Sequence, residues 1–293
     1  MSNKQFLELP YGKDDFPLLR EGNCYFVDKT PYLKTVFTDQ SAVMLFTRPR
    51  RFGKTLLISM FDSFLKINPE KPFDNSKQLE LFKGTKILED KEFCDKFMGQ
   101  CPVIAITLKD VSGDDFKDAY FKLAEVVAGV AAKFEFLMGS PKLNAKEKAK
   151  FDKISDEDYL KSFAKKPKSY LTSAIASLAS MLYKHFNKQV YVLIDEYDVP
   201  LAKAQSYGYH KDMVTLMSSF LGFLKDSQKD PETNKPVVKK VILTGCLKVA
   251  KNSIFTGVNN LKVNTVTSKI DKYTGMIGFT KEETLKLLKD YEM

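Results

Sequence analysis

Five short apolar runs, separated by longer stretches of helical periodicity, constrain the fold of this chain more than any other feature of its sequence. The runs lie at 42–46, 103–108, 190–194, 241–243 and 261–266. The first four are apolar at nearly consecutive positions, which is typical of strands covered on both faces in a parallel sheet. Because helical patterns lie between them, the sequence predicts a doubly wound α/β fold.

The segments around these runs are predicted to be helical. Thr30 as cap and Pro31 in the first turn predict a helix ahead of the first strand. The stretch 109–188, rich in Lys, Ala and Phe, predicts a helical insertion between the second and third strands. Thr280 and Glu283 form a capping-box pattern that opens a last amphipathic helix.

Composition excludes several classes of function. The four cysteines are Cys24, Cys94, Cys101 and Cys246. They have no CxxC spacing, so neither a zinc site nor a disulfide framework is expected. The histidines His185 and His210 both lie in helical patterns, which argues against histidine-dependent catalysis. No apolar run approaches the roughly 18 residues of a membrane span, and the N-terminus lacks a signal-peptide pattern, so we expect a cytoplasmic protein.

The arginines are more informative than the net charge of +9. Lysines are interleaved with acidic residues along the chain, which is typical of a solvated surface. Of the four arginines, Arg48, Arg50 and Arg51 fall within four positions. Because the guanidinium group offers a fixed fork of donors that suits phosphate, this concentration predicts an anion site.

The same arginines belong to a loop between the first apolar run and a helical pattern. Its residues are Arg48, Pro49, Arg50, Arg51, Phe52, Gly53, Lys54, Thr55 and Leu56. Strand, loop and helix in this order predict a P-loop, in which backbone N–H groups wrap the phosphates of ATP. Lys54 would then contact the β and γ phosphates, and the Thr55 hydroxyl would ligate Mg²⁺.

One glycine of the usual pattern GxxxxGK[ST] is missing, because Arg48 stands where the first glycine is expected. Gly53 is retained, so a close approach of the backbone to phosphate remains available. Pro49 and the conformation of Arg48 would have to hold the start of the loop. Taken alone, the segment also fits a basic turn before an ordinary helix.

The third apolar run ends in two acids, Asp195 and Glu196, an arrangement typical of a Walker B strand. Asp195 would hold Mg²⁺, largely through water, and Glu196 would act as general base on the attacking water. Asp198 follows two residues later, and either orients Glu196 or caps the next helix. The fourth run ends at Thr244, which is a candidate γ-phosphate sensor or part of an ordinary Thr-Gly turn.

Together these residues resemble the predicted AAA-ATPase-like family of bacterial proteins, whose P-loop reads RPRRFGK[ST]L. The resemblance also includes the segments 9–12, 25–30, 194–201 and 253–261. It implies a three-layer AAA-like core with a mainly parallel sheet of strand order 5-1-4-3-2, and frequent fusion to a nuclease-like domain of the PD-(D/E)XK class. We expect a core at 1–275 and the incomplete start of a helical lid or C-terminal domain at 276–293.

The resemblance implies a Mg²⁺-dependent ATPase that converts nucleotide state into a conformational change, with nucleic acid, a nuclease-like domain or further copies as partners. No arginine follows Arg51, so no arginine finger comes from the later part of the sequence and slow turnover is expected. Two other readings remain open: a nucleotide-gated scaffold that scarcely hydrolyses ATP, and a small-molecule kinase that uses the insertion for its substrate.

Overall fold

The computed structural model describes residues 6–225, 228–231, 233–247, 254–258, 261–268 and 271–292. The chain forms two compact units. The first unit comprises Met1–Gln40, Arg48–Gln100 and Val266–Met293, and the second comprises Ser41–Thr47 and Cys101–Thr265. Each unit is built from segments that are distant in the sequence. Three members of the resemblance segments, Ser253, Asn259 and Asn260, lie outside the described residues.

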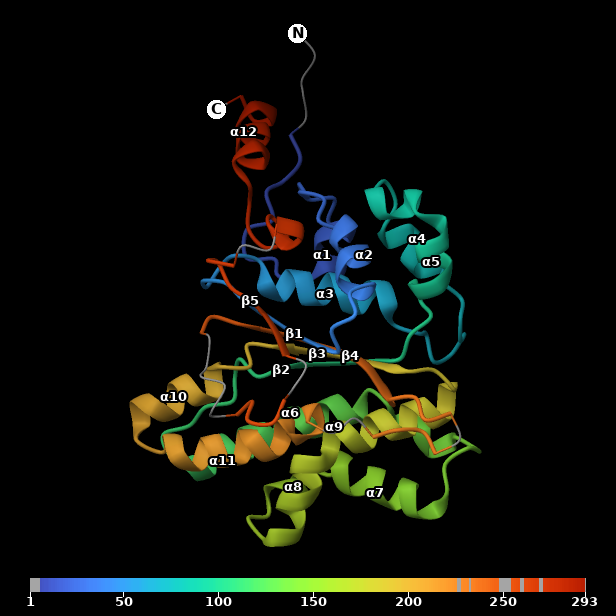
Figure 1. Ribbon diagram of the computed structural model, residues 1–293, viewed down its shortest axis with the longest axis vertical. Helices are drawn as coiled ribbons and strands as arrows, with labels where there is room; N and C mark the ends of the chain where they lie inside the picture. The colour runs from blue at the N-terminus through green and yellow to red at the C-terminus, as the bar shows by residue number, and fades with distance from the viewer. Residues whose placement is uncertain are drawn as a thin grey trace. The chain divides into compact units, whose positions relative to one another are not determined.

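A five-stranded sheet forms the centre of the second unit (Figure 1). Its strands are β1 (Val43–Thr47), β2 (Val103–Thr107), β3 (Val190–Asp195), β4 (Val238–Gly245) and β5 (Leu261–Asn264). Their order is β2-β3-β4-β1-β5, and every neighbouring pair is parallel. The expected order 5-1-4-3-2 is therefore confirmed, since it is the same order counted from the opposite edge.

Burial of the strands explains their sequence pattern. Every residue of β1 and β3 is buried, which is why both strands are apolar on consecutive positions. Strand β4 begins three residues before the predicted 241–243 and includes Lys239 and Lys240. Lys240 is only 2% exposed, and its Nζ donates to the carbonyl oxygen of Ser41 at 3.0 Å. This hydrogen bond gives the buried ammonium group an acceptor and so reduces the cost of burying a lysine in the strand.

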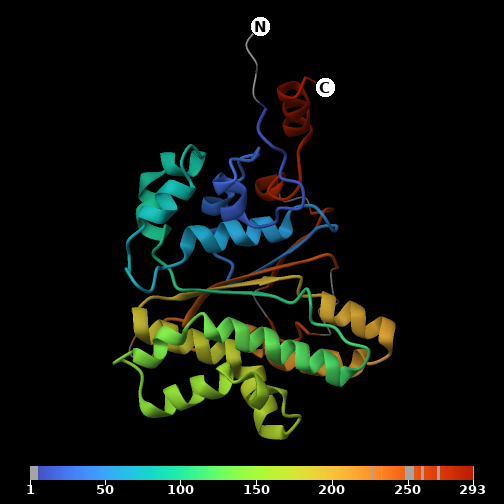
Figure 2. The same cartoon turned by 180° about the vertical axis from the view of Figure 1, so that it is seen from behind.

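Helices cover one face of this sheet, as seen from both sides in Figures 1 and 2. They are α6 (Phe116–Ala132), η2 (Glu135–Gly139), α7 (Ala145–Ser155), α8 (Glu157–Lys161), α9 (Lys165–Phe186), α10 (Val199–Tyr207), α11 (His210–Phe220) and η3 (Leu221–Leu224). Helices α6 and α9 pack on the sheet, with α7 and α8 beyond them. Asp115 caps α6, and Asn144 with Glu147 forms a capping box on α7. The predicted helical insertion at 109–188 is confirmed.

The first unit is helical. Its elements are α1 (Phe16–Glu21), α2 (Pro31–Phe37), α3 (Lys54–Leu65), α4 (Ser76–Leu81), η1 (Lys86–Glu89), α5 (Lys91–Phe97), η4 (Asp271–Tyr273) and α12 (Lys281–Asp290). Buried phenylalanine rings join α3 to its neighbours: the ring centroid of Phe82 lies 4.8 Å from that of Phe16 and 5.2 Å from that of Phe64. Such contacts fix the helix that follows the candidate loop.

Two predicted helix starts have different outcomes. Thr280 and Glu283 form both bonds of the capping box on α12, so that prediction is confirmed. Thr30 occupies the capping position of α2 and Pro31 begins the helix, as predicted, but the Thr30 side chain makes no capping hydrogen bond. Its hydroxyl instead donates to Asp28 Oδ1 at 2.6 Å and accepts from the amide of Ile87 at 3.2 Å. The local sequence pattern around Thr30 does not reveal these two hydrogen-bond partners of its hydroxyl.

Candidate functional site

The loop that follows β1 has a backbone conformation suited to anions. Arg51 has φ +65° and Gly53 has φ +87°, whereas Phe52 between them is not in the left-handed region. Left-handed residues beside ordinary ones turn successive N–H groups toward one point and create a concave anion site. Nothing lies within 4 Å of the position a Gly53 Cβ would occupy, so the space there is open. The glycine is needed for its φ angle rather than for lack of room.

Lys54 begins helix α3 and is held inside this loop. Its side chain is almost fully buried, at 3% exposure, and its Nζ donates to the carbonyl oxygen of Pro49 at 3.2 Å. Pro49 and Arg50 themselves are exposed, while Thr55 and Leu56 are half-buried. The loop therefore closes around the Lys54 side chain. Arg48 is half-buried, and burial lowers the pKa of its guanidinium.

Helix α3 has no side-chain cap at its N-terminus, because the capping position is Gly53. The amide of Leu57 bonds to the carbonyl oxygen of Gly53 at 3.0 Å, which starts the helical ladder. The amides before it lie in the first turn, where an α-helix offers N–H groups and the positive end of its dipole. An anion over the loop would meet these groups.

An apolar cavity of about 730 Å³ adjoins the loop within the first unit. Phe52, Gly53 and Leu56 line it on one side, and residues from both ends of the unit, among them Tyr25 and Ile277, line the rest. Sequence alone does not predict this cavity. The segments 9–12 and 25–30 carry part of the family resemblance, but nothing in their local pattern indicates that they line a shared space.

The acids of the second unit stand at the carboxyl end of β3. Asp195 is 2% exposed and is the last residue of the strand. The hydroxyl of Thr244, on the neighbouring strand β4, donates to its Oδ1. Glu196 is half-buried and has φ +53°, a left-handed conformation that costs a non-glycine residue roughly 1 kcal/mol or more. Strain of this kind is found mainly where function requires a particular side-chain direction.

The carboxylate of Asp198 bonds to the backbone that follows β4, and neither sequence interpretation of this residue predicted that. Asp198 occupies the capping position of α10, as one interpretation expected, but its side chain makes no capping hydrogen bond. Its carboxylate accepts hydrogen bonds from the amides of Cys246 at 3.1 Å and Leu247 at 2.7 Å, and not from Glu196. The residue is 3% exposed. It joins the acidic segment after β3 to the turn after β4.

The structure thus brings three of the predicted catalytic and metal residues together: Asp195, Glu196 and Thr244 share the carboxyl edge of one sheet. Thr47, the last residue of β1, pairs with Gly245 at the same edge, and the chain continues from it into Arg48. The predicted nucleotide-binding residues 48–56 form one continuous loop and helix start in the first unit.

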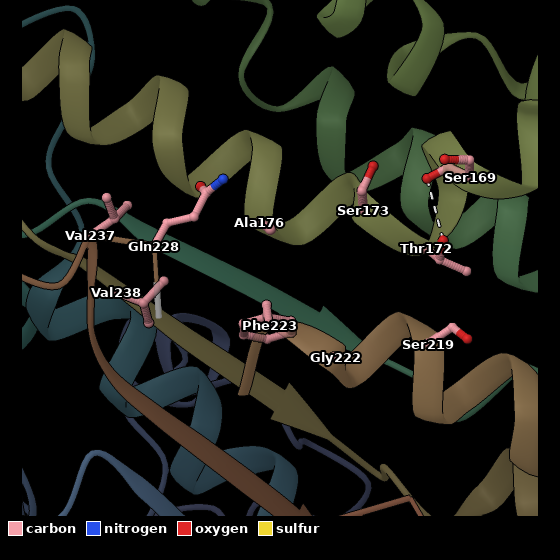
Figure 3. A pocket seen from close by; sticks show the side chains of 10 residues that line it. All are labelled: Ser169, Thr172, Ser173, Ala176, Ser219, Gly222, Phe223, Gln228, Val237 and Val238. Atoms are coloured by element: carbon pink, nitrogen blue, oxygen red, sulfur yellow. Dashed lines mark hydrogen bonds between the residues drawn. The ribbon is translucent and has the colours of Figure 1, made fainter. Parts of the chain in front are cut away.

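A second groove in the second unit has no relation to these acids (Figure 3). Its volume is about 300 Å³, and it lies between α9 and the end of α11. The hydroxyls on its walls, such as those of Thr172 and Ser219, bond to carbonyls of their own helices. Val238, at the amino end of β4, also lines it, which places the groove about 20 Å of strand from Thr244.

Across the described residues, no group of three or more His, Cys, Asp or Glu side chains is arranged to hold a metal. No helix in that same part of the chain has the length and apolarity needed to cross a membrane.

A parallel sheet of order 2-3-4-1-5, with a glycine- and lysine-containing loop after β1 and acids after β3, defines an α/β protein of the AAA-like class. The chain matches the family described as "Predicted AAA-ATPase" over residues 10–255, and it belongs to that family. The suspected resemblance is thereby confirmed, and with it a family assignment that implies nucleotide binding.

A relative from Azotobacter chroococcum mcd 1, described as an uncharacterized protein in the vnfD 5' region, is similar at 24% identity over 284 residues. The alignment covers 97% of this chain and 44% of the relative, so the chain spans less than half of the relative's length. Among solved structures, none matches the chain.

Proposed function

We propose that this chain binds ATP with Mg²⁺ at the loop 48–56 and hydrolyses it with the acids that follow β3. The observation that carries the proposal is the loop itself: Lys54 is buried against the carbonyl oxygen of Pro49, between left-handed Arg51 and Gly53 and the start of α3. A buried ammonium group at a helix N-terminus, inside a ring of amides, is complementary to a polyphosphate.

In this proposal the loop binds and orients the phosphates. Backbone N–H groups between Arg48 and Leu56 would donate to the phosphate oxygens, and Lys54 would exchange the Pro49 carbonyl oxygen for oxygens of the β and γ phosphates. Arg50 and Arg51 are exposed and add positive potential. Both arginines belong to the loop and their side chains are exposed to solvent. They would therefore supply positive charge to the transition state.

The Mg²⁺ that accompanies ATP would neutralise charge on the β and γ phosphates. The donor chemistry fits: Thr55 offers a hydroxyl and Asp195 a carboxylate, and Mg²⁺ prefers such oxygens together with phosphate and water. Asp195 Oδ1 accepts from the Thr244 hydroxyl, which helps to fix the orientation of the carboxylate. A metal that arrives with its nucleotide does not need a separate cluster of protein ligands.

Glu196 would take the proton from the attacking water, and Thr244 would respond to the γ-phosphate through its bond to Asp195. A general base must point at the water rather than away from it. The left-handed backbone at Glu196 supports this role, since it redirects the side chain at the end of the strand.

The apolar cavity beside Phe52 and Leu56 would receive the nucleoside. Ligand pockets of several hundred Å³ with mainly apolar walls commonly enclose a flat ring system. Both ends of the first unit line this cavity, so nucleotide binding would change the contacts of α12 and of the residues at 276–293, which we propose as the start of a lid. This would couple nucleotide state to conformation.

Phosphate release and nucleotide binding test the proposal in wild type, Lys54→Ala and Glu196→Gln. We expect Lys54→Ala to weaken binding and lower hydrolysis about 100-fold. Glu196→Gln should retain binding while hydrolysis falls by about 100-fold or more. Binding without hydrolysis in all three would favour the scaffold alternative, and equal phosphate release in all three would remove the enzyme proposal.

Single- and double-stranded DNA, added separately to the wild-type reaction, test the proposed nucleic-acid partner. The net charge of +9 is the reason for this experiment, because a positively charged protein attracts the anionic DNA backbone. Stimulation that disappears in Glu196→Gln would support a partner acting on the same site. An unchanged rate with both DNAs would remove nucleic acid from the proposal.

A further inference from the structure

The turn that follows β4 is held by the segment that follows β3. Asp198 accepts from two consecutive amides of this turn, those of Cys246 and Leu247, at 3.1 and 2.7 Å. A carboxylate that accepts two backbone N–H groups makes stronger bonds than a neutral acceptor would. The turn begins immediately after Gly245, the last residue of β4, and Thr244 directly precedes that glycine.

Tyr197 adds two further hydrogen bonds between the same segments. Its amide donates to the carbonyl oxygen of Thr244 at 3.0 Å, and its hydroxyl donates to the carbonyl oxygen of Leu247 at 2.6 Å. Its ring is fully buried, with its centroid 5.4 Å from that of Phe255. Tyr197 and Asp198 thus form hydrogen bonds to the backbone on both sides of the turn.

The packing leaves no space for the turn to shift. A Cβ on Gly245 would overlap the Asp198 carboxylate and would lie 2.6 Å from Cε1 of Tyr197. The backbone of the turn therefore lies directly on these two side chains. Close contact of this kind transmits a displacement from one segment to the other.

The turn in its present position brings two side chains to the proposed catalytic acids. Thr244 bonds to Asp195, and the thiol of Cys246 points toward Glu196, with Sγ 3.9 Å from Oε2. Both contacts depend on where the backbone of 244–247 lies. The Asp198 carboxylate makes its hydrogen bonds to that backbone.

We propose that Asp198 is a positioning residue, which fixes the 245–247 turn so that Thr244 and Cys246 hold Asp195 and Glu196 in the geometry for hydrolysis. This inference rests on the proposed function for its effect on ATP. The positioning itself is a property of the nucleotide-free protein and has its own readouts.

Asp198→Asn is the informative variant, because it keeps the volume but replaces one acceptor oxygen with a donor that cannot bond to an N–H group. Oδ2 of Asp198 accepts from both amides, and Oδ1 accepts from Cys246 at 3.2 Å. The substitution therefore weakens the bonds to both amides, because a neutral acceptor forms weaker hydrogen bonds than a carboxylate does. Asp212→Asn is the matched control: it makes the same change at an exposed residue in the first turn of α11. Tyr197→Phe removes only the hydroxyl bonded to Leu247 and is a milder second variant.

Two measurements do not need ATP. In Asp198→Asn we expect hydrogen exchange at the amides of Cys246 and Leu247 to accelerate about tenfold, because a neutral amide oxygen binds these N–H groups less strongly than the carboxylate does. Alkylation of Cys246 should accelerate as well, because its turn is released. The buried thiols Cys24, Cys94 and Cys101 should keep their rates, which separates a local release from general unfolding.

Hydrolysis supplies the third readout. We expect Asp198→Asn to lower kcat about tenfold with KM for ATP within about twofold, because the loop that binds the phosphates is not altered. In a Thr244→Val background, Asp198→Asn should lower kcat by a smaller factor than in wild type, because both substitutions act through the same turn. Tyr197→Phe should change exchange and kcat in the same direction by a smaller factor.

Unchanged exchange and alkylation at Cys246 in Asp198→Asn would overturn the inference even if wild type hydrolyses ATP. Equal acceleration of all four cysteines would overturn it too, since Asp198 would then only stabilise the fold. Conversely, a released turn in a protein whose wild type does not hydrolyse ATP would contradict the proposed function and leave the positioning of the turn supported.

Discussion

The hydroxyl of Thr244 donates to the carboxylate of Asp195, although the two residues are 49 positions apart. Both side chains are buried, with Thr244 fully inaccessible and Asp195 2% exposed. The bond joins the ends of the neighbouring strands β3 and β4. It occupies one oxygen of the acid that we propose as a Mg²⁺ ligand, and so it links the proposed sensor to the proposed metal site.

Thr244→Val should destabilise the protein and lower hydrolysis. Valine has nearly the shape of threonine but leaves the buried Asp195 oxygen without its donor, which costs about 1–3 kcal/mol. Chemical denaturation and phosphate release measure the two effects. Thr244→Ser keeps the hydroxyl and is the control. Hydrolysis of ATP by the valine variant at the wild-type rate would contradict the proposed sensor role of Thr244.

Glu196→Gly should be more stable than Glu196→Ala, although both remove the proposed base. At φ +53° alanine keeps the left-handed strain and glycine relieves it, a difference of about 1 kcal/mol in the free energy of unfolding. Both variants should lose hydrolysis to a similar extent. Urea denaturation of the pair measures the difference, and an alanine variant as stable as the glycine variant would show that the backbone at 196 is not strained.

Gly245→Ala should destabilise the protein by about 2 kcal/mol, because the added methyl group overlaps Asp198 and the Tyr197 ring. Gly222→Ala is a suitable control in η3, where nothing lies within 4 Å of the added Cβ. Thermal unfolding of both variants measures the contrast. Equal melting temperatures would mean that the turn after β4 has more room than the structure gives it.

The ion pair between Lys29 and Glu283 should stabilise the first unit by about 1 kcal/mol. Lys29 Nζ lies 2.6 and 2.5 Å from the two Glu283 oxygens, and the side chains are only 11% and 26% exposed. A double-mutant cycle with Lys29→Met and Glu283→Gln measures the coupling. Glutamine still supports the capping box, so the helix start is preserved.

The pair Lys122–Glu125 on α6 is the control for that cycle, since both of its side chains are about half exposed. Its coupling should be no more than a few tenths of a kcal/mol and should vanish in high salt. A Lys29–Glu283 coupling as small as this would argue that α12 is not held by the ion pair.

His185 should make the stability of the protein fall in mild acid. Burial, and to a lesser extent the charge of Lys142, lowers the pKa of His185 from its ordinary 6.5. The unfolded chain therefore binds the proton at higher pH than the folded chain does. The contribution to stability is fully present above about pH 6.5 and is lost as the pH falls through the lowered pKa.

Melting temperatures of wild type and His185→Gln between about pH 8 and pH 5 test this. The wild-type curve should fall more steeply in acid than that of the variant. Parallel curves would show that the ring of His185, which contacts Phe136 and Phe186, does not resist protonation in the folded state.

Much of the fold was predictable because it depends on short-range pattern. The buried strands β1 and β3 have consecutive apolar residues, and Thr280 with Glu283 encodes the start of α12 within four positions. The side-chain partners of individual residues were not predictable in this way. Thr30 stands at the start of α2 as predicted, but its hydroxyl bonds to Asp28 and Ile87, and the buried Lys240 of β4 bonds to Ser41.

The sequence by itself determined the parallel α/β architecture, the helical insertion, the loop with Lys54 and the acids after β3, since apolar periodicity and neighbouring residue types specify them locally. Only the tertiary structure decided what Asp198 bonds to and which segments enclose the apolar cavity. The physical reason is that a hydrogen bond between β3 and β4 depends on strand register, and a cavity depends on packing. Neither is written in the residues around Asp198 or Tyr25.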